Sequence, residues 1–456
     1  MLNNIKTLRK HFLSGKTLDI SHRLTCLTQF ELMIDAYEDE MISAVYKDFK
    51  KPNFETLATE IVMLRKEISY FKKRLKKLVK PQKVTSSILN FPSTDYLVYK
   101  PYGVVLIIAP WNYPLLLSLQ PLLAALVTGN CVVLKPSEYS TATSHLIYEL
   151  IPKYFDENLV KIVLGGVDET SALLKNKFDK IFFTGSTTVG KIIYQAAAKY
   201  LTPVVLELGG KSPCVITKNA NLKIAAKRIA FGKFVNAGQT CIAPDFIYID
   251  KTIEDQFIAE FKLAIEQFYG ENPENSTDFA RIINQKNFNR LLNYLNDGEI
   301  LIGGSSNPSD LYIEPTVLKV VDFNKDVMQN EIFGPVLPII TYQDISEVIV
   351  YNHNNPKPLA FYVFSDDTSE VNYLLNNCMF GGASINDCLT HIINHRLPFG
   401  GVGDSGMGNY HGKFSFEAFS HVSGVIYRAN WLDFKIKYPP YKQKTFHLLK
   451  KITKYL

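Results

Sequence analysis

The sequence predicts an α/β protein with a doubly wound parallel sheet, followed by a second α/β domain. Short β-branched runs alternate with helical patterns from Val104 to about residue 208. A second alternating series begins at Cys214 and continues to about residue 395. Such alternation is typical of parallel sheets built from βαβ units. Because a chain of 456 residues is longer than chains that usually fold around one hydrophobic core, we expect two or three domains.

The elements follow in order along the chain. The first eighty residues are predicted to be mainly helical, with spaced apolar positions facing inward. The apolar region from Val104 to Leu134 is interrupted by prolines and polar residues, so we expect strand, loop, helix and strand instead of one membrane-spanning helix. The predicted strands are Val104–Ala109, Cys131–Leu134, Val160–Leu164, Lys180–Phe183 and Val204–Leu206, then Phe246–Ile249 and Leu337–Ile340 in the second series.

Composition excludes several classes of function. The formal charge of +6 is concentrated at the C-terminus, where residues 427–456 hold eight basic residues and one acidic residue, so the remainder sums to −1. A near-neutral body with a basic tail does not predict a nucleic-acid binder. Six cysteines without zinc or disulfide spacing, and a charged N-terminus without an export signal, predict a cytoplasmic protein. The histidines show no metal-ligand spacing, so no metal is predicted.

Two motifs carry candidate chemistry. Cys241 lies in the small, glycine-bearing turn Asn236–Pro244 after an amphipathic helix, which indicates an exposed thiol nucleophile. Glu207 follows an apolar strand and precedes paired glycines. The glycines permit the backbone to turn tightly and another group to approach it closely. Taken alone, such a cysteine is more often a small buried residue, and such a glutamate is usually solvated.

A third motif resembles a phosphate-binding turn. A strand ending near Phe183 passes through Gly185 and Ser186 into a helix that contains Gly190. Backbone N–H groups and the positive helix end there could hold a pyrophosphate. The spacing also matches a nucleotide triphosphatase loop, but Ile192 replaces the Ser or Thr that would bind magnesium. A plain strand-to-helix turn is the other interpretation.

Two more motifs, Pro110–Pro114 and Asn330–Pro335, join those around Glu207 and Cys241 in a pattern of four in a fixed order. Together they resemble the aldehyde dehydrogenase superfamily from about residue 5 to about residue 440, and Gly209–Cys214 and Leu397–Gly401 are most similar to its class three branch. The resemblance implies a dinucleotide-binding domain, a catalytic domain and an arm that joins two subunits as a homodimer. The corresponding segments are residues 1–80 with 99–208, residues 209–400, and residues 81–98 with 401–456.

The resemblance also implies roles for individual residues. Cys241 would attack an aldehyde, Glu207 would activate water, and the Asn112 amide would stabilise the oxyanion. NAD would be the cofactor, with NADP possible, although Glu138 would repel a 2′-phosphate by like charge. The other implied cofactor contacts are Lys135 on the adenosine ribose, Gly185, Ser186 and Gly190 at the pyrophosphate, and Glu331 and Phe333 at the nicotinamide riboside.

The implied reaction is oxidation of an aldehyde to a carboxylic acid, without acylation of coenzyme A because Glu207 is present. Tyr113, Ile392 and Ile393 would line an apolar substrate wall, which favours medium- or long-chain aliphatic or aromatic aldehydes; they could instead only fill a domain interface. A cofactor-independent thiol esterase and a non-catalytic structural or binding relative are the alternatives.

The tail is a separate feature. Phe446, Leu449, Ile452 and Leu456 stand at near-helical spacing between lysines. Such a basic amphipathic helix could make peripheral contact with an anionic membrane or could pack on a second subunit.

Overall fold

The computed structural model describes residues 2–453, and it divides into two compact units. The larger unit comprises Met1–Leu78 and Pro101–His421, and the smaller comprises Val79–Lys100 and Val422–Leu456. Predicted residues Lys454 and Leu456 of the tail lie outside the described residues.

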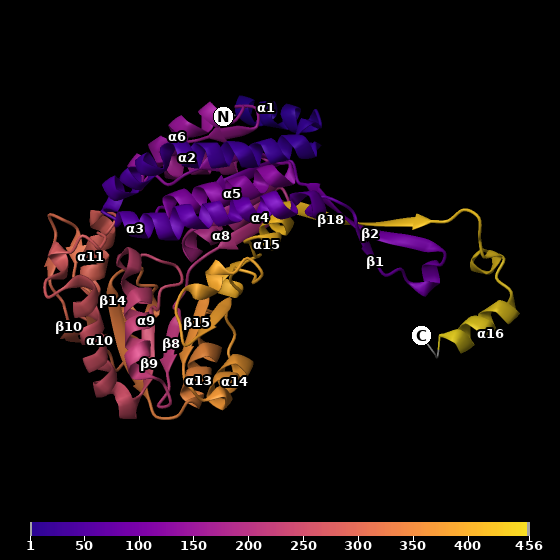
Figure 1. Ribbon diagram of the computed structural model, residues 1–456. Helices are drawn as coiled ribbons and strands as arrows, with labels where there is room; N and C mark the ends of the chain where they lie inside the picture. Colours follow the sequence, from indigo (N-terminus) through magenta and orange to yellow (C-terminus); the bar gives the residue numbers. More distant parts are fainter. Residues whose placement is uncertain (1, 454–456) are drawn as a thin grey trace. The chain divides into compact units, whose positions relative to one another are not determined.

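Figure 1 shows the chain coloured from its N-terminus to its C-terminus. The larger unit contains a six-stranded sheet in the order β17-β7-β6-β3-β4-β5. The five strands from β7 to β5 are parallel, and β17 pairs antiparallel with β7. Their bounds are β3 Val104–Ile108, β4 Cys131–Lys135, β5 Val160–Ile162, β6 Lys180–Thr184, β7 Val204–Glu207 and β17 Gly406–Met407. These strands confirm the predicted doubly wound parallel sheet.

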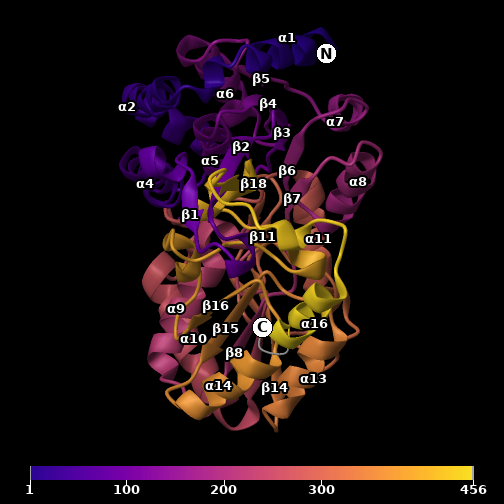
Figure 2. The same ribbon diagram turned by 90° about the vertical axis from the view of Figure 1, so that its right-hand side faces the viewer.

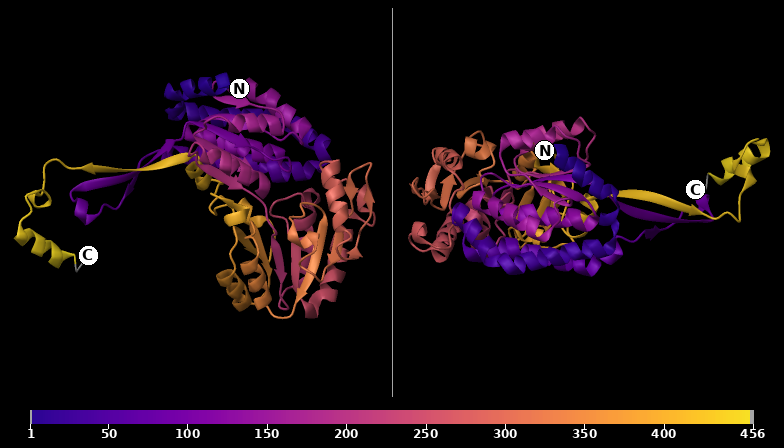
Figure 3. Two further views of the ribbon diagram at one scale, coloured as in Figure 1. Left: turned by 180° about the vertical axis from the view of Figure 1, so that it is seen from behind. Right: turned by 90° about the horizontal axis from the view of Figure 1, so that it is seen from above.

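Helices pack around this sheet, as Figure 3 shows from two further sides. The predicted helical N-terminus is confirmed, and α2 packs on α5 and α6. Every residue of α5 is buried, and the order β3, loop, α5, β4 confirms the interpretation of the apolar region. The helices are α1 Leu2–Leu13, α2 Ile20–Phe49, α3 Asn53–Thr56, α4 Val62–Leu78, α5 Pro114–Thr128, α6 Thr141–Tyr154, α7 Val167–Leu174 and α8 Thr187–Ala198.

A second sheet of seven strands has the order β10-β13-β14-β9-β8-β15-β16. All its pairings are parallel except that between β10 and β13. Strands β8, β15 and β16 lie side by side in Figure 2. The strands are β8 Pro213–Ile216, β9 Phe246–Asp250, β10 Glu299–Ile302, β13 Thr316–Lys319, β14 Val336–Tyr342, β15 Ala360–Phe364 and β16 Gly382–Ile385.

Helices and short elements complete the larger unit, and α9 packs along α10. The helices are α9 Leu222–Phe234, α10 Glu254–Tyr269, α11 Gln285–Tyr294, α12 Asp326–Gln329, α13 Ser346–Asn354, α14 Thr368–Asn377 and α15 Lys413–Ala418. A two-stranded ribbon is formed by β11 Ser306–Asn307 and β12 Tyr312–Ile313.

The smaller unit is built on a three-stranded sheet in the order β1-β2-β18. Its elements are β1 Gln82–Val84, β2 Ser93–Pro101, β18 Ser420–Arg428 and α16 Gln443–Ile452. Helix α16 has the predicted apolar positions Phe446, Leu449 and Ile452, all exposed. Within residues 2–453, no helix combines the length and apolar character needed to cross a membrane.

Candidate active site

A cleft of about 720 Å³ in the larger unit brings most of the predicted site residues together. It lies where β6 and β7 end, which is the carboxyl edge at which parallel sheets bind ligands. Among the residues that line it are the predicted residues Asn112, Gly185, Ser186, Glu207, Cys241, Glu331 and Phe333, which come from five separate segments of the chain. The four motifs that are far apart in sequence therefore meet at one site.

The turn before Cys241 has an unusual backbone. Asn236, Ala237 and Gly238 have φ values of 57°, 51° and 74°, so three consecutive residues are left-handed. A Cβ atom at Gly238 would lie 2.2 Å from the Gly334 carbonyl oxygen, so only glycine fits there. Left-handed conformations are costly for residues other than glycine, and such strain is often found at functional sites.

Hydrogen bonds join this turn to the Asn112 loop. The Asn112 side-chain amide donates to the Gln239 carbonyl at 3.0 Å. The Asn236 side-chain amide donates to the carbonyl oxygens of Asn112 and Gln239, each at 3.0 Å. The two loops that hold the predicted nucleophile and the predicted oxyanion donor are therefore fixed to each other.

Cys241 is partly exposed, whereas the other five cysteines are buried. Burial of the thiol, with the nearby carboxyls of Glu331 and Glu207, raises the pKa of Cys241 to about 12. The sulfur is therefore protonated near neutral pH in this arrangement. Nucleophilic attack would require a base or a nearby positive charge, since the thiolate is the reactive form.

Glu207 lies at the end of β7 and is 2% exposed. Neither carboxyl oxygen has a hydrogen-bond partner in the described part of the chain. Burial raises the pKa of Glu207 well above its usual range. An unpaired carboxyl of this kind can hold a proton and can exchange it with a water molecule in the cleft.

The β6–α8 turn forms the phosphate end of the cleft. Ser186 caps α8, and the lining continues through Thr187 and Thr188. The free N–H groups of the first helical turn and the helix dipole favour an anion here. Gly190 does not line the cleft; a Cβ atom there would lie 2.6 Å from the Leu208 side chain, so this glycine permits close helix–strand packing.

Glu331 and Phe333 form another part of the wall. A Cβ atom at Gly209 would lie 2.2 Å from the Glu331 carboxylate, so the glycine allows that carboxyl to approach the chain. Burial, followed by the charge of Asp245, raises the pKa of Glu331 to about 8. The Phe333 ring stands edge-on to Trp111, with ring centres 5.3 Å apart.

Lys135 and Glu138 lie outside the cleft lining and form an ion pair at 2.7 Å. Lys135 is the last residue of β4 and is buried, whereas Glu138 is exposed.

The three predicted substrate residues also lie outside the cleft lining. The Tyr113 hydroxyl lies 2.6 Å from the Thr240 hydroxyl, next to Cys241 in sequence. Ile392 and Ile393 belong to a short helical turn, and Ile393 lines a separate pocket of about 300 Å³. Most of the residues that line that pocket are polar, among them Lys66, Lys73, Arg74, His395 and Arg396.

Sequence reasoning missed several residues of the site. Trp111, Lys211 and Arg290 line the cleft. Lys211 is partly buried and pairs with Asp245 at 2.5 Å. The sequence signal for Lys211 was its place directly after the paired glycines that follow Glu207, whereas nothing around Arg290 marks it as part of a site.

The residues present fit a nicotinamide dinucleotide. The capped start of α8 offers N–H groups to a pyrophosphate, and the Glu331 Oε1 atom is buried without a hydrogen-bond partner within residues 2–453. A ribose hydroxyl would satisfy that oxygen, and the Phe333 ring offers an apolar surface beside it.

The model of the aldehyde dehydrogenase family matches residues 3–425 of this chain. The chain belongs to the aldehyde dehydrogenase family. It is 45% identical to 4,4′-diaponeurosporen-aldehyde dehydrogenase of Staphylococcus aureus over 95% of each chain. It is 42% identical to a dimeric NADP-preferring aldehyde dehydrogenase of Canis lupus familiaris over 96% of this chain and 97% of that one.

Among solved structures, the substrate-bound state of Staphylococcus aureus AldH has a TM-score of 0.96 and 43% identity, covering 99% of both chains. The chain is also 44% identical to aldehyde dehydrogenase family 3 member H1 of Arabidopsis thaliana over 98% of this chain and 94% of that one, which confirms the predicted resemblance to the class three branch. This aldehyde dehydrogenase is therefore an oxidoreductase that oxidises aldehydes with NAD or NADP.

Proposed function

We propose that this enzyme oxidises medium- or long-chain aliphatic or aromatic aldehydes to free carboxylic acids, with Cys241, Asn112 and Glu207 as its catalytic residues. The observation that carries the proposal is that these three side chains, from three distant segments, line one cleft with the capped start of α8.

In the first step, the Cys241 sulfur bonds to the aldehyde carbon while its proton leaves to a base or to solvent. The carbonyl π electrons move to oxygen and form a tetrahedral thiohemiacetal. The Asn112 amide and the Cys241 backbone N–H are assigned to stabilise this oxyanion. Removing one such donor typically costs about 3 kcal/mol of transition-state stabilisation.

When bound, the nicotinamide cofactor would supply the hydride acceptor for the oxidation. On the protein, the thiohemiacetal loses its C–H bond with both electrons, the C=O bond reforms and a thioester remains on Cys241. Glu207 then takes a proton from water as the water oxygen attacks the thioester carbon. The C–S bond breaks, which releases the acid and restores the sulfur for another cycle.

For the cofactor, Lys135 is assigned to the adenosine ribose, and Gly185, Ser186 and Gly190 to the pyrophosphate turn. NAD is the proposed cofactor because the carboxylate of Glu138, paired with Lys135, would repel a 2′-phosphate. NADP remains the alternative, since the dimeric relative from dog is named NADP-preferring.

The substrate class is suggested by the Staphylococcus aureus relative, which is named for 4,4′-diaponeurosporen-aldehyde. Tyr113, Ile392 and Ile393 lie outside the cleft lining, so their assignment to an apolar substrate wall stays a prediction. Apolar walls bind aliphatic or aromatic aldehydes better than charged ones.

A homodimer is proposed through the smaller unit, where β18 is nine residues long and forms one edge of its sheet. Val422, Ile426 and Tyr427 on that strand are exposed. A long edge strand with exposed apolar side chains is suited to pair with another chain.

Reduced-nicotinamide absorbance tests the proposal. Purified enzyme would be given six- to twelve-carbon aldehydes and benzaldehyde, each with NAD and with NADP. We expect turnover that increases with apolar chain length and disappears in Cys241→Ala. If the enzyme hydrolysed esters without cofactor and oxidised none of the aldehydes, it would be a thiol esterase. If it showed no activity in either assay, it would be a non-catalytic relative.

A further inference from the structure

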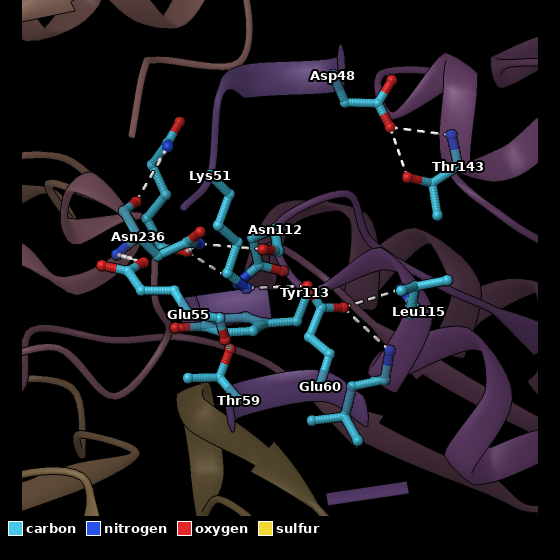
Figure 4. A network of polar contacts seen from close by, with 12 residues as sticks. Asp48, Lys51, Glu55, Thr59, Glu60, Asn112, Tyr113, Leu115, Thr143 and Asn236 are labelled. Carbon is cyan, nitrogen blue, oxygen red and sulfur yellow. Dashed lines mark hydrogen bonds and ion pairs between the residues drawn. The ribbon is translucent and has the colours of Figure 1, made fainter. Parts of the chain in front are cut away.

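A buried ion pair, Lys51 with Glu60, lies in the segment that joins α2 to α4 (Figure 4). The Lys51 ammonium and a Glu60 carboxylate oxygen are 2.8 Å apart, and both side chains are fully buried. Neither residue lines the cleft, and the family reaction assigned above uses neither. A buried ion pair loses the solvation of both charges, so it is weak evidence for stability alone.

Glu60 caps the helix that follows Asn112. Its second carboxylate oxygen accepts hydrogen bonds from the backbone N–H groups of Leu115 and Leu116 at 2.9 and 3.1 Å. Tyr113, at the N-cap position of α5, provides no side-chain cap of its own. A carboxylate at a helix N-terminus satisfies otherwise unpaired donors and opposes the positive helix end. Glu60 therefore fixes the start of α5 from a different segment.

The backbone around Glu60 sets its direction. Residues Leu57–Ile61 form a π-helical turn between α3 and α4. Such a turn inserts one extra residue and shifts the side chains that follow it around the helix axis, and π-turns are frequent at functional sites. The π-helical turn thus orients the Glu60 side chain so that it contacts both the start of α5 and Lys51.

Lys51 extends the network to the other side of the loop. Its ammonium nitrogen lies 3.9 Å from the centre of the Tyr113 ring, and the Tyr113 hydroxyl contacts the Thr240 hydroxyl. Thr240 directly precedes Cys241. A cation held against a ring face is attracted by the ring's electron density, more strongly when both are removed from water. Lys51 contacts the face of the Tyr113 ring and Thr240 contacts its hydroxyl, so the two residues together fix the position of the residue that follows Asn112.

Glu55 provides a second connection, to the turn before the nucleophile. Its carboxylate accepts a hydrogen bond from the backbone N–H of Asn236 at 2.9 Å. Asn236 in turn donates to the Asn112 and Gln239 carbonyls. This backbone N–H belongs to a left-handed residue, so its partner stabilises the strained turn.

We propose that Lys51, Glu55 and Glu60 are positioning residues that set the distance between the Asn112 amide and the Cys241 backbone N–H, and so align the oxyanion donors. They act through Tyr113, α5 and Asn236, and none of the three lines the cleft. Donors arranged before the reaction stabilise the transition state because they need no rearrangement when charge develops. The inference rests on the proposed roles of Cys241 and Asn112.

The first test separates alignment from folding. Lys51→Met leaves the Glu60 charge buried and unpaired, so we expect a lower Tm and a lower kcat. The double variant Lys51→Met with Glu60→Gln removes both charges but keeps a carbonyl oxygen for the α5 N–H groups. We expect Tm to recover while kcat stays about 10- to 100-fold below wild type, as for small displacements of catalytic groups. Cofactor Kd, measured by fluorescence, should be unchanged.

A double variant with normal Tm and wild-type kcat would overturn the assignment of the ion pair. The matched control is Lys161→Met with Glu157→Gln, which removes an exposed ion pair in the same unit and should leave kcat unaltered. Failure of the wild-type enzyme to oxidise any aldehyde would instead contradict the proposed function, so the two failures are distinguishable.

A second test concerns Glu55 and needs no turnover. Glu55→Gln keeps an acceptor for the Asn236 N–H, whereas Glu55→Leu removes it with little change in size. We expect iodoacetamide to alkylate Cys241 at the wild-type rate in the Gln variant and at a rate changed at least several-fold in the Leu variant, located by peptide mass. Equal alkylation rates in all three proteins would remove Glu55 from the proposal.

Discussion

At the residue scale, the proposed nucleophile and the proposed base share one electrostatic property. Burial raises the pKa values of both the Cys241 thiol and the Glu207 carboxyl. Two neutral groups can share a small, poorly solvated space without mutual repulsion, whereas two anions could not. Each group would therefore become charged only in the step that uses it, when substrate, cofactor or water has changed its surroundings.

Replacing Glu207 tests its assigned step. In Glu207→Gln, we expect thioester hydrolysis to slow by about 10²- to 10⁴-fold, the usual contribution of a general base. The acyl-enzyme should then accumulate and appear as added mass on the intact protein. Because the wild-type carboxyl must ionise to act, and its pKa is raised, wild-type kcat should increase as pH rises through a range higher than that in which an ordinary carboxyl ionises. A variant that clears the thioester at the wild-type rate would contradict this role.

At the scale of elements, the strand and helix pattern was largely predictable. The predicted runs Val104–Ala109 and Val204–Leu206 agree with β3 and β7 to within one residue, because buried parallel strands are continuous apolar runs. The short β17 was not predicted, since Gly406 and Met407 have no such pattern. Its pairing with β7 depends on residues about two hundred positions away.

The candidate site was partly predictable for the same reason. Cys241, Glu207 and Asn112 stand in glycine- or proline-bearing turns that are visible in sequence. Lys51 and Glu60 have no local signal: an isolated lysine and glutamate near a helix usually face solvent. Their burial arises from the tertiary packing of α4 and α5 and from a π-helical turn that periodicity does not reveal.

Lys135 tests the cofactor assignment at the end of β4. We expect Lys135→Ala to raise the KM for NAD by about 10-fold, the loss of one hydrogen bond from a charged donor, with little change in kcat. Initial rates at varied NAD and saturating aldehyde measure this. Lys161→Ala is the control, because it removes an ion-paired lysine of the neighbouring strand β5. An unchanged KM in Lys135→Ala would remove the residue from the cofactor site.

At the scale of the whole molecule, charge and apolar surface are unevenly divided between the two units. Residues 427–456 carry most of the net positive charge, and the apolar side chains of α16 are exposed. Exposed apolar surface on a basic helix is suited to an anionic membrane or to another protein surface.

Truncation of the chain before Lys442 distinguishes between a membrane and a protein partner for α16. If the tail makes peripheral membrane contact, the full chain should sediment with vesicles containing anionic lipid, and the truncated chain should not. Sedimentation should also weaken at high salt, because surface charge interactions are screened. Equal recovery of both proteins would contradict membrane contact. Light scattering on the same pair measures the mass in solution, and a smaller mass after truncation would assign the tail to the dimer.

The contrast between one accessible cysteine and five buried ones has a practical consequence. Since only Cys241 is partly exposed, a thiol reagent in the native enzyme should be consumed at one equivalent per polypeptide. The stoichiometry of that reaction would give the fraction of polypeptides with an intact Cys241 thiol in any preparation. If the two sites of an assembly reacted at different rates, the reagent consumption would show half-of-sites behaviour. No added label is needed to observe this.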